Sequence, residues 1–296
     1  MNCVHRDKSW QIVNYKNIYF IELYENAICI YSKTFELVYK KRTSNNYYSQ
    51  IMIVEDTLFA QGGCSTFIDI MEIPTLEKKK RIQWKEEKGF ERSGELLYIK
   101  KKNIVITELY SDMKDISIIT MIDINTYREK TVWRAEKTFL KNIIYSDKMD
   151  DYLILYRKIS TYKNKEAYID EILWIKQKKK IMQNINIQGK YESICEVMVN
   201  SNDEICCLVG FFYNGYILNI AEDKKIAKDV DLIATSKDKK KIAYIKKDML
   251  YVYSWEENLY LKKIKLQMKT PYYEMQFIDD KYIAVRDNSY MHWYEL

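Results

Sequence analysis

The chain has 296 residues, of which 48 are basic and 42 acidic, giving a formal net charge of +6. Its 47% hydrophobic and 30% charged residues are typical of a globular protein with one or two domains. The sequence has no apolar run of about 18 residues, which excludes a membrane-spanning helix. It has only seven glycines and no glycine-rich phosphate loop, which excludes dinucleotide and P-loop chemistry.

The first residues and the cysteines predict a cytoplasmic protein. Residues 1–8 carry charges of both signs and no apolar run, so we expect no signal peptide. The six cysteines form no C-x-x-C pair and favour reduced, mostly buried thiols. Because successive strand residues face opposite ways, Cys206 and Cys207 should point to opposite sides of their sheet.

Short apolar runs bounded by polar residues recur along the chain and predict β-strands. In chain order, the clearest units pair an apolar strand with a lysine-rich strand across a polar turn. These pairs cover residues 27–40, 67–82, 118–132 and 249–264, with weaker copies at 168–185 and 216–226. Two further strands precede each pair, as in 231–236 and 241–246. No window shows a capped amphipathic helix of three turns.

Four antiparallel strands repeated every 40 to 50 residues are typical of the blades of a β-propeller. We therefore expect an all-β chain forming a single domain over residues 1–296. The last blade contains only three strands, and residues 1–7 could add the missing one, which would avoid an unpaired edge. Six or eight blades remain alternatives to seven. The predicted blades span residues 10–42, 47–85, 94–134, 138–187, 192–230, 231–266, and 272–296 with 1–7.

The strand–turn–strand units ending in residues 121–126 and 252–257 resemble those of a divergent WD40-like β-propeller. The resemblance covers essentially the whole chain. The sequence departs from that pattern because it has no Trp-Asp dipeptide and no Gly-His pair at the blade starts. The resemblance therefore implies an architecture and no particular functional family.

Few residues are suited to catalysis or metal binding. His5 and His292 are the only histidines, and closure of the last blade should bring them onto neighbouring strands. Together they could form a pH-sensitive latch or half of a metal site, with Cys3 as a nearby thiol, or they could be unrelated edge residues. We predict no catalytic residue, no metal and no cofactor. A propeller enzyme with a central acidic pocket is an alternative, with four candidate acids: Glu108, Asp112, Asp203 and Glu204.

Lysines are grouped in runs at 40–42, 78–81, 100–102, 178–180 and 239–241. On an outermost strand, lysine prevents pairing between sheet edges. The alternative is a basic rim that binds nucleic acid, although interspersed acidic residues weaken that hypothesis.

We expect a non-enzymatic scaffold that binds another protein, as a subunit of a larger assembly and without a membrane partner. A nucleic-acid-associated accessory protein is an alternative. Aromatic and arginine side chains on loops between strands are favoured as interface anchors. A protruding hairpin is expected near residues 162–165. The candidate interaction residues are Tyr47, Tyr48, Phe90, Arg92, Tyr162, Phe212, Tyr213, Tyr272 and Tyr273.

Overall fold

A computed structural model describes most of the chain as two compact units. One unit is Ser9–Ile143, and the other combines Met1–Lys8 with Ile144–Leu296. No helix in the described part of the chain is long and apolar enough to cross a membrane. The described residues are 3, 5–43, 47–162, 165–187, 193–200, 202–210, 215–236, 238, 240–255, 257, 259–267 and 272–296.

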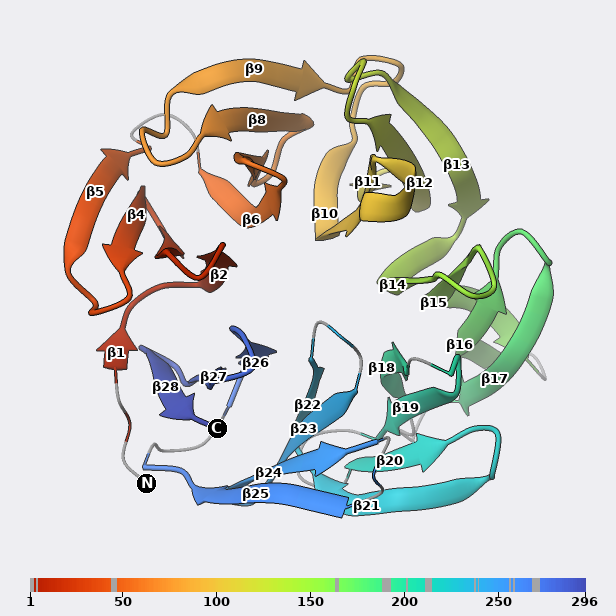
Figure 1. Cartoon of the computed structure of the whole chain (residues 1–296). Helices are drawn as coiled ribbons and strands as arrows, with labels where there is room; N and C mark the ends of the chain where they lie inside the picture. Colours follow the sequence, from red (N-terminus) through yellow and green to blue (C-terminus); the bar gives the residue numbers. More distant parts are fainter. Residues whose placement is uncertain are drawn as a thin grey trace. The chain divides into compact units, whose positions relative to one another are not determined.

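The unit Ser9–Ile143 contains three complete antiparallel sheets of four strands, ordered as in the chain (Figure 1). A short 3-10 turn, η1 (Lys100–Lys102), joins two strands of the third sheet. The first sheet has β2 (Gln11–Tyr15), β3 (Tyr19–Tyr24), β4 (Ala27–Ser32) and β5 (Leu37–Arg42). The second has β6 (Tyr48–Val54), β7 (Thr57–Gly62), β8 (Phe67–Glu72) and β9 (Lys78–Gln83). The third has β10 (Glu91–Ile99), β11 (Ile104–Ser111), β12 (Ile116–Asp123) and β13 (Glu129–Glu136).

Four further sheets follow, and the boundary between the units falls within the first strand, β14 (Thr138–Ser146). That sheet continues with β15 (Asp151–Tyr162), β16 (Lys165–Trp174) and β17 (Lys179–Ile187). The next sheet has β18 (Ile194–Val199), β19 (Ile205–Val209), β20 (Gly215–Asn219) and β21 (Lys224–Val230). It is followed by a sheet of β22 (Leu232–Thr235), β23 (Lys241–Lys246), β24 (Met249–Ser254) and β25 (Leu259–Lys265). The last sheet has β26 (Glu274–Phe277), β27 (Tyr282–Arg286), β28 (Met291–Glu295) and β1 (His5–Asp7).

The N-terminal strand completes the last sheet. β1 pairs antiparallel with β28, with His5 opposite Trp293 and Arg6 opposite His292. The predicted fold class, a seven-bladed β-propeller of four-stranded blades closed by the N-terminal strand, is therefore confirmed. The predicted proximity of the two histidine-bearing strands is confirmed as well. The single-domain assignment stays a prediction, and the third sheet, from Glu91 to Glu136, exceeds its predicted range of 94–134.

Burial explains why the middle strands contain continuous apolar runs. In β3 and β4 four consecutive residues of six are buried, whereas β5 is exposed along most of its length. The apolar side chains of β3 and β4 pack against those of β6, β7 and β8 in one cluster. Strands covered on both faces have apolar residues on both faces, so they lose the alternation of a half-exposed strand.

A β-bulge interrupts the pairing of the third and fourth strands in six of the seven sheets. One extra residue on the fourth strand is left unpaired at each bulge, and β21 has two bulges. A bulge increases the twist of a sheet edge and so hinders pairing with other edges. The extra residues are Val38, Lys79, Val132, Ile181, Ile226, Asp229 and Leu261.

Non-glycine residues adopt the left-handed conformation in five of the turns that precede these outermost strands. Leu76 (φ 53°) is fully buried in the core, and Phe35 (φ 62°) stacks on Phe20 with ring centroids 5.5 Å apart. Packing of this kind offsets the roughly 1 to 2 kcal/mol cost of that conformation for a side chain with a Cβ. The other three residues are Tyr127, Lys178 and Asp223.

Candidate functional sites

The structure distributes the predicted interaction residues between core and surface. Tyr47 and Tyr273 are 41% and 52% exposed. Tyr48, Phe90 and Tyr272 are buried and pack into apolar clusters. Arg92 is also buried, as described below, so the structure does not bring the predicted set together as one surface.

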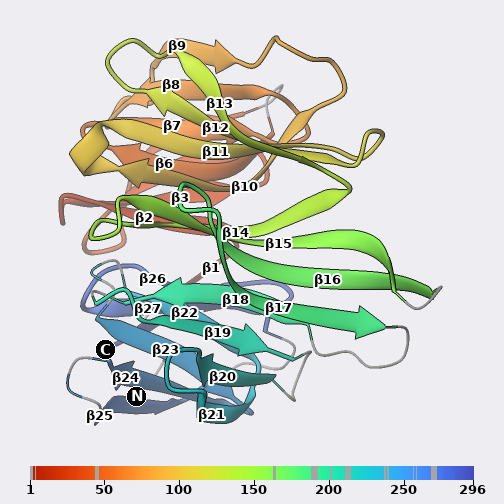
Figure 2. The same cartoon turned by 90° about the vertical axis from the view of Figure 1, so that its right-hand side faces the viewer.

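Three predicted interaction residues have no described side chain. Phe212, Tyr213 and the side chain of Tyr162 lie outside the described residues. The backbones of Tyr162 and Lys165 are paired at the end of the long hairpin of β15 and β16 (Figure 2). A hairpin therefore lies at the predicted position, and its role in binding stays a prediction.

Buried ion pairs hold the outer strands of two neighbouring sheets in the unit Ser9–Ile143. The Arg81 guanidinium on β9 donates two hydrogen bonds, of 2.6 and 2.7 Å, to the fully buried Asp69 carboxylate on β8. Tyr48 donates a third, of 2.7 Å. Burial alone would raise the pKa of Asp69, but these bonds outweigh it and hold the pKa below its usual value. Arg92 likewise donates to Glu129 at 3.0 and 2.8 Å.

A cavity of about 570 Å³ lies beside these pairs and is lined by β9, Trp84, Tyr127 and Glu129. Arg81 and Glu129 already have charged partners, and the Lys80 ammonium lies 4.4 Å from the centroid of the Tyr127 ring. These three charged groups therefore contribute to the stability of the fold. Apart from the lysine run at 78–81, no sequence pattern predicts this cavity.

Glu108 on β11 is a buried carboxyl without an ion-pair partner among the described residues. Its side chain is hydrogen-bonded to Ser117 at 3.3 Å, and only 3% of the residue is exposed. Burial raises its pKa to about 7, although hydrogen bonds partly oppose this shift. Gly94 (φ 68°) makes room for it, because a Cβ there would lie 2.6 Å from a Glu108 oxygen. A carboxyl this inaccessible is poorly placed to act on a substrate.

The other three candidate acids belong to turns. Asp112 is exposed after the end of β11. Asp203 accepts a hydrogen bond of 2.6 Å from Ser146, and Glu204 accepts one of 2.5 Å from Asn200. Hydrogen bonds of this kind stabilise turns. Among the described residues of their own units, Asp112, Asp203 and Glu204 are not paired with a second buried acid, as a central acidic pocket would require.

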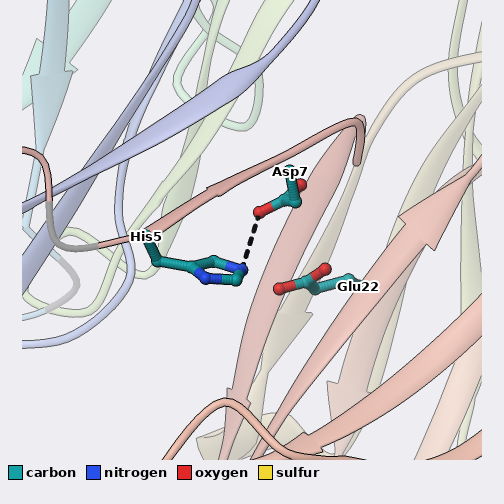
Figure 3. Close-up of side chains that lie close together, drawn as sticks. All are labelled: His5, Asp7 and Glu22. Atoms are coloured by element: carbon teal, nitrogen blue, oxygen red, sulfur yellow. Dashed lines mark ion pairs between the residues drawn. The ribbon is translucent and has the colours of Figure 1, made fainter.

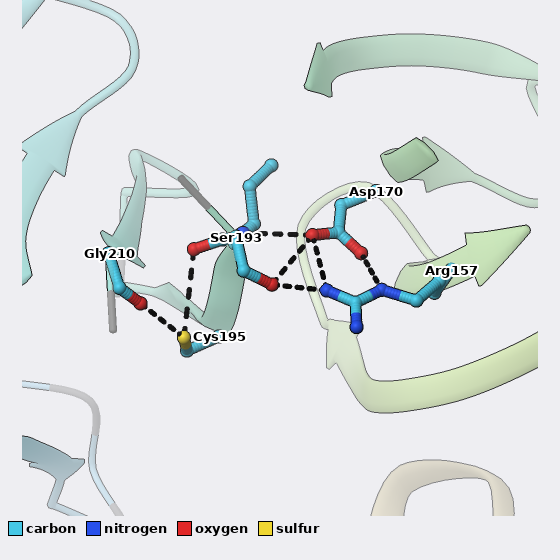
Figure 4. Close-up of polar contacts among 6 residues, drawn as sticks. Arg157, Asp170, Ser193, Cys195 and Gly210 are labelled. Atoms are coloured by element: carbon cyan, nitrogen blue, oxygen red, sulfur yellow. Dashed lines mark hydrogen bonds and ion pairs between the residues drawn. The ribbon is translucent and has the colours of Figure 1, made fainter. Parts of the chain in front are cut away.

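A clamp of polar residues joins two sheets in the other unit (Figure 4). Arg157 on β15 donates hydrogen bonds of 2.8 and 3.0 Å to Asp170 on β16, which is fully buried. Asp170 also accepts a bond of 2.9 Å from Ser193, next to β18. The exposed Cys195 donates to the carbonyl of Gly210 at 2.8 Å. This clamp could not be predicted from the sequence because its residues are far apart in the chain.

The closing strand has its own polar contacts. His5 forms an ion pair with Asp7 at 3.5 Å, with both side chains on β1 (Figure 3). Asp7 also accepts a hydrogen bond of 3.1 Å from the indole of Trp293 on β28. Burial lowers the pKa of His5, although Asp7 opposes the shift. These contacts fix β1 against β28.

Cys206 and Cys207 face opposite sides of β19, as predicted. Both are fully buried, and they belong to two different apolar clusters. Burial raises the pKa of Cys207 to about 12 and raises that of Cys206 as well. Both thiols are therefore protonated and act as small apolar side chains.

Two outermost strands, one in each unit, expose consecutive large apolar residues. On β5, Leu37, Val38 and Tyr39 are 55%, 48% and 42% exposed. On β25 the corresponding run is Leu259, Tyr260 and Leu261, at 46%, 55% and 43%. Each run contains the bulge residue and is followed by two lysines. We call these two runs the apolar edge segments.

Comparison with known proteins shows the fold and nothing more specific. No model of a protein family matches the sequence, and no curated protein matches it significantly. Two solved structures are similar to it at 10% sequence identity and a TM-score of 0.63. One is the β-propeller domain of Cps50 (Swd1) from Myceliophteria thermophila, which covers 100% of this chain and 99% of its own. The other is the Dos1 propeller, for which the match covers 96% of this chain and 77% of the Dos1 chain. The resemblance to WD40-like propellers is therefore confirmed at the level of architecture.

Proposed function

We propose that this protein is a non-enzymatic, cytoplasmic scaffold that binds another protein through its apolar edge segments. The observation that carries the proposal is the exposure of three consecutive large apolar side chains on β5 and again on β25. Contiguous exposed apolar residues on a monomer commonly mark a site of protein interaction. Tyrosine, present in both segments, is enriched among residues that dominate binding energy.

The charged groups support a scaffold over an enzyme. The buried carboxylates Asp69, Glu129 and Asp170 are each paired with an arginine, so they are structural. Glu108 is enclosed. Acid–base catalysis requires a group within hydrogen-bonding reach of a substrate, and none of these buried carboxyls is exposed enough to offer one.

The lysine runs are partly neutralised within the fold, which disfavours the nucleic-acid alternative. Lys79 pairs with Glu72 at 3.4 Å, and Lys180 pairs with the buried Glu171 at 2.6 Å. Binding to nucleic acid by a basic rim would weaken steeply as salt increases.

Co-purification from the native host with two matched variants tests the proposal. The β5 variant carries Leu37→Thr, Val38→Thr and Tyr39→Thr. The β9 control variant carries Lys78→Gln and Lys79→Gln on another outermost strand. We expect a partner protein to be recovered with the unchanged chain and the β9 control variant but lost with the β5 variant. A matching set on β25, Leu259→Thr with Leu261→Thr, tests the second segment.

Three outcomes would contradict the proposal. The first is recovery of the same partner with the β5 and β25 variants, which would place the interface elsewhere. The second is salt-sensitive binding to generic DNA or RNA that the β9 control variant loses, which would favour the nucleic-acid alternative. The third is the absence of any stoichiometric partner.

We propose two additional contacts with the partner, the exposed Tyr47 and Tyr273. The ring of Tyr47 packs edge-on against that of Trp10, with ring centroids 5.4 Å apart.

A further inference from the structure

The last sheet brings a cysteine, a histidine and an aspartate together, although Cys3 and His292 lie at opposite ends of the sequence. Cys3 lies just before β1 and is partly buried against the apolar cluster that contains Tyr294. Its sulfur is 3.9 Å from Nδ1 of His292 on β28. The thiol also donates a hydrogen bond of 2.8 Å to the carbonyl of His5. The distance from sulfur to Nδ1 allows a hydrogen bond after a small movement of either side chain.

Asp287 fixes the orientation and the tautomer of His292. The His292 side chain is 7% exposed, and its Nε2 lies 2.9 Å from Oδ2 of Asp287. The other Asp287 oxygen accepts backbone N–H bonds of 2.8 Å from Ser289 and Tyr290. Burial alone would raise the pKa of Asp287, but these bonds and His292 lower it below its usual value. The carboxylate can therefore only accept, so Nε2 carries the proton and the Nδ1 lone pair faces Cys3.

We propose that Cys3 is a reactive thiol, activated by His292, that exchanges with low-molecular-weight disulfides. As the sulfur attacks one sulfur of the disulfide, Nδ1 of His292 takes the thiol proton. A mixed disulfide forms on Cys3, and the disulfide's S–S bond breaks. The protonated imidazole then returns the proton to the leaving thiolate, so atoms and electrons balance. Asp287 is a positioning residue, because it acts on Cys3 only through His292.

The other charged and titratable groups of this sheet have their own partners. The guanidinium of Arg6 lies 3.6 Å from the centroid of the Tyr290 ring, and Asp7 is bonded to Trp293. Asp7 also pairs with His5. Burial, with a smaller contribution from Cys3, raises the pKa of Tyr294 to about 12, so this phenol is uncharged near neutral pH. These contacts leave His292 as the base that faces the thiol.

The remaining cysteines provide comparisons within the same molecule. Cys64 and Cys195 are exposed, whereas Cys29, Cys206 and Cys207 are buried. Exposure alone would make Cys64 and Cys195 react faster than the partly buried Cys3. Activation by His292 predicts the opposite order.

The test follows the reaction of the whole chain with an aromatic dipyridyl disulfide and quantifies each modified cysteine by mass spectrometry. At mildly acidic pH, Cys3 should react at least about tenfold faster than Cys64, a modest part of what general-base catalysis commonly contributes. His292→Gln should remove this advantage and move the rate–pH profile of Cys3 to that of Cys64. His5→Gln is the matched control, because it changes the other histidine and keeps the carbonyl that bonds Cys3. Asp287→Asn should give an intermediate rate.

Two results would overturn the proposal. One is a Cys3 that reacts no faster than Cys64 in the unchanged protein, a measurement that needs no variant to fold. The other is a fast Cys3 whose rate and pH profile are the same in His292→Gln as in the unchanged chain. An equal loss in His292→Gln and His5→Gln would also count against it, because loosening of β1 would then explain the effect.

Discussion

The outermost strands β5 and β9 occupy the same position in neighbouring elements of the repeat, but their side chains do different things. Both strands contain a bulge, and both carry a run of lysines. On β9, Arg81 is anchored to the buried Asp69, and Lys79 pairs with Glu72. On β5, Leu37 and Tyr39 face solvent. The repeat therefore determines where an outer strand lies, whereas its own residues determine whether it holds the sheet or offers a surface.

The largest expected effect comes from breaking the anchor of β9. Arg81→Ala leaves the Asp69 carboxylate fully buried without its guanidinium. We expect the free energy of unfolding to fall by about 3 kcal/mol, the lower end of the range for an uncompensated buried charge. Denaturant titration measures this change. Lys79→Ala, which removes an exposed pair, should cost less than about 1 kcal/mol. Equal losses in the two variants would contradict the distinction between anchor and surface.

Glu108, unlike Asp69, is a buried carboxyl with no ion-pair partner among the described residues. We therefore expect a dependence of the free energy of unfolding on pH that is nearly as large as the effect of Arg81→Ala. The pKa of Glu108 in the folded protein, about 7, exceeds its ordinary value of 4.5. The unfolded chain therefore releases this proton first as pH rises, so its contribution to stability is fully present below about pH 4.5 and is lost by about pH 7. The loss amounts to about 3 kcal/mol. Glu108→Gln should remove this part of the pH dependence and make the protein more stable than the unchanged chain at pH 8.

Unfolding curves measured across this pH range test that prediction. Asp112→Asn, at an exposed position near the same strand, is the control and should keep the pH dependence of the unchanged chain. The same slope in Glu108→Gln as in the control would show that Glu108 titrates normally.

A smaller effect is expected in the turn that leads into β17. Lys178 is exposed and has a φ of 52°, a conformation that glycine adopts without strain. Lys178→Gly should raise the free energy of unfolding by about 0.5 to 1 kcal/mol. Lys179→Gly, in the strand itself, should lower it by a similar amount. A thermal unfolding comparison would contradict the assignment if both variants were destabilised.

The smallest effect on stability should come from the apolar edge segment of β5. Because its three residues are exposed, at 42% to 55% of their surface, the β5 variant should change the free energy of unfolding by no more than about 0.5 kcal/mol. A loss of several kcal/mol in denaturant titration would mean that the segment holds the sheet together, as β9 does.

Much of the architecture could be predicted because it depends on local patterns. The apolar runs of β3 and β4, the polar turns and the incomplete last blade indicate four-stranded units and closure by residues 1–7. Individual roles depend on contacts distant in sequence and were less predictable. Arg92 and Tyr48 follow polar segments typical of loops, yet both are buried. Arg92 is hydrogen-bonded to Glu129, 37 residues away, and Tyr48 to Asp69, 21 residues away. The exposure of Leu37 was not predicted, because an apolar run is normally a sign of burial.

Calorimetric titration of the co-purified partner into the purified chain tests the central claim most directly. The β5 variant should bind this partner more weakly by roughly 2 kcal/mol or more, which is about 30-fold in affinity, as expected for the core of an interface. The β9 control variant should bind within a few-fold of the unchanged chain, and the unchanged complex should form with a negative heat capacity change. Equal affinities for the β5 variant and the unchanged chain would contradict the claim that this strand forms the interface.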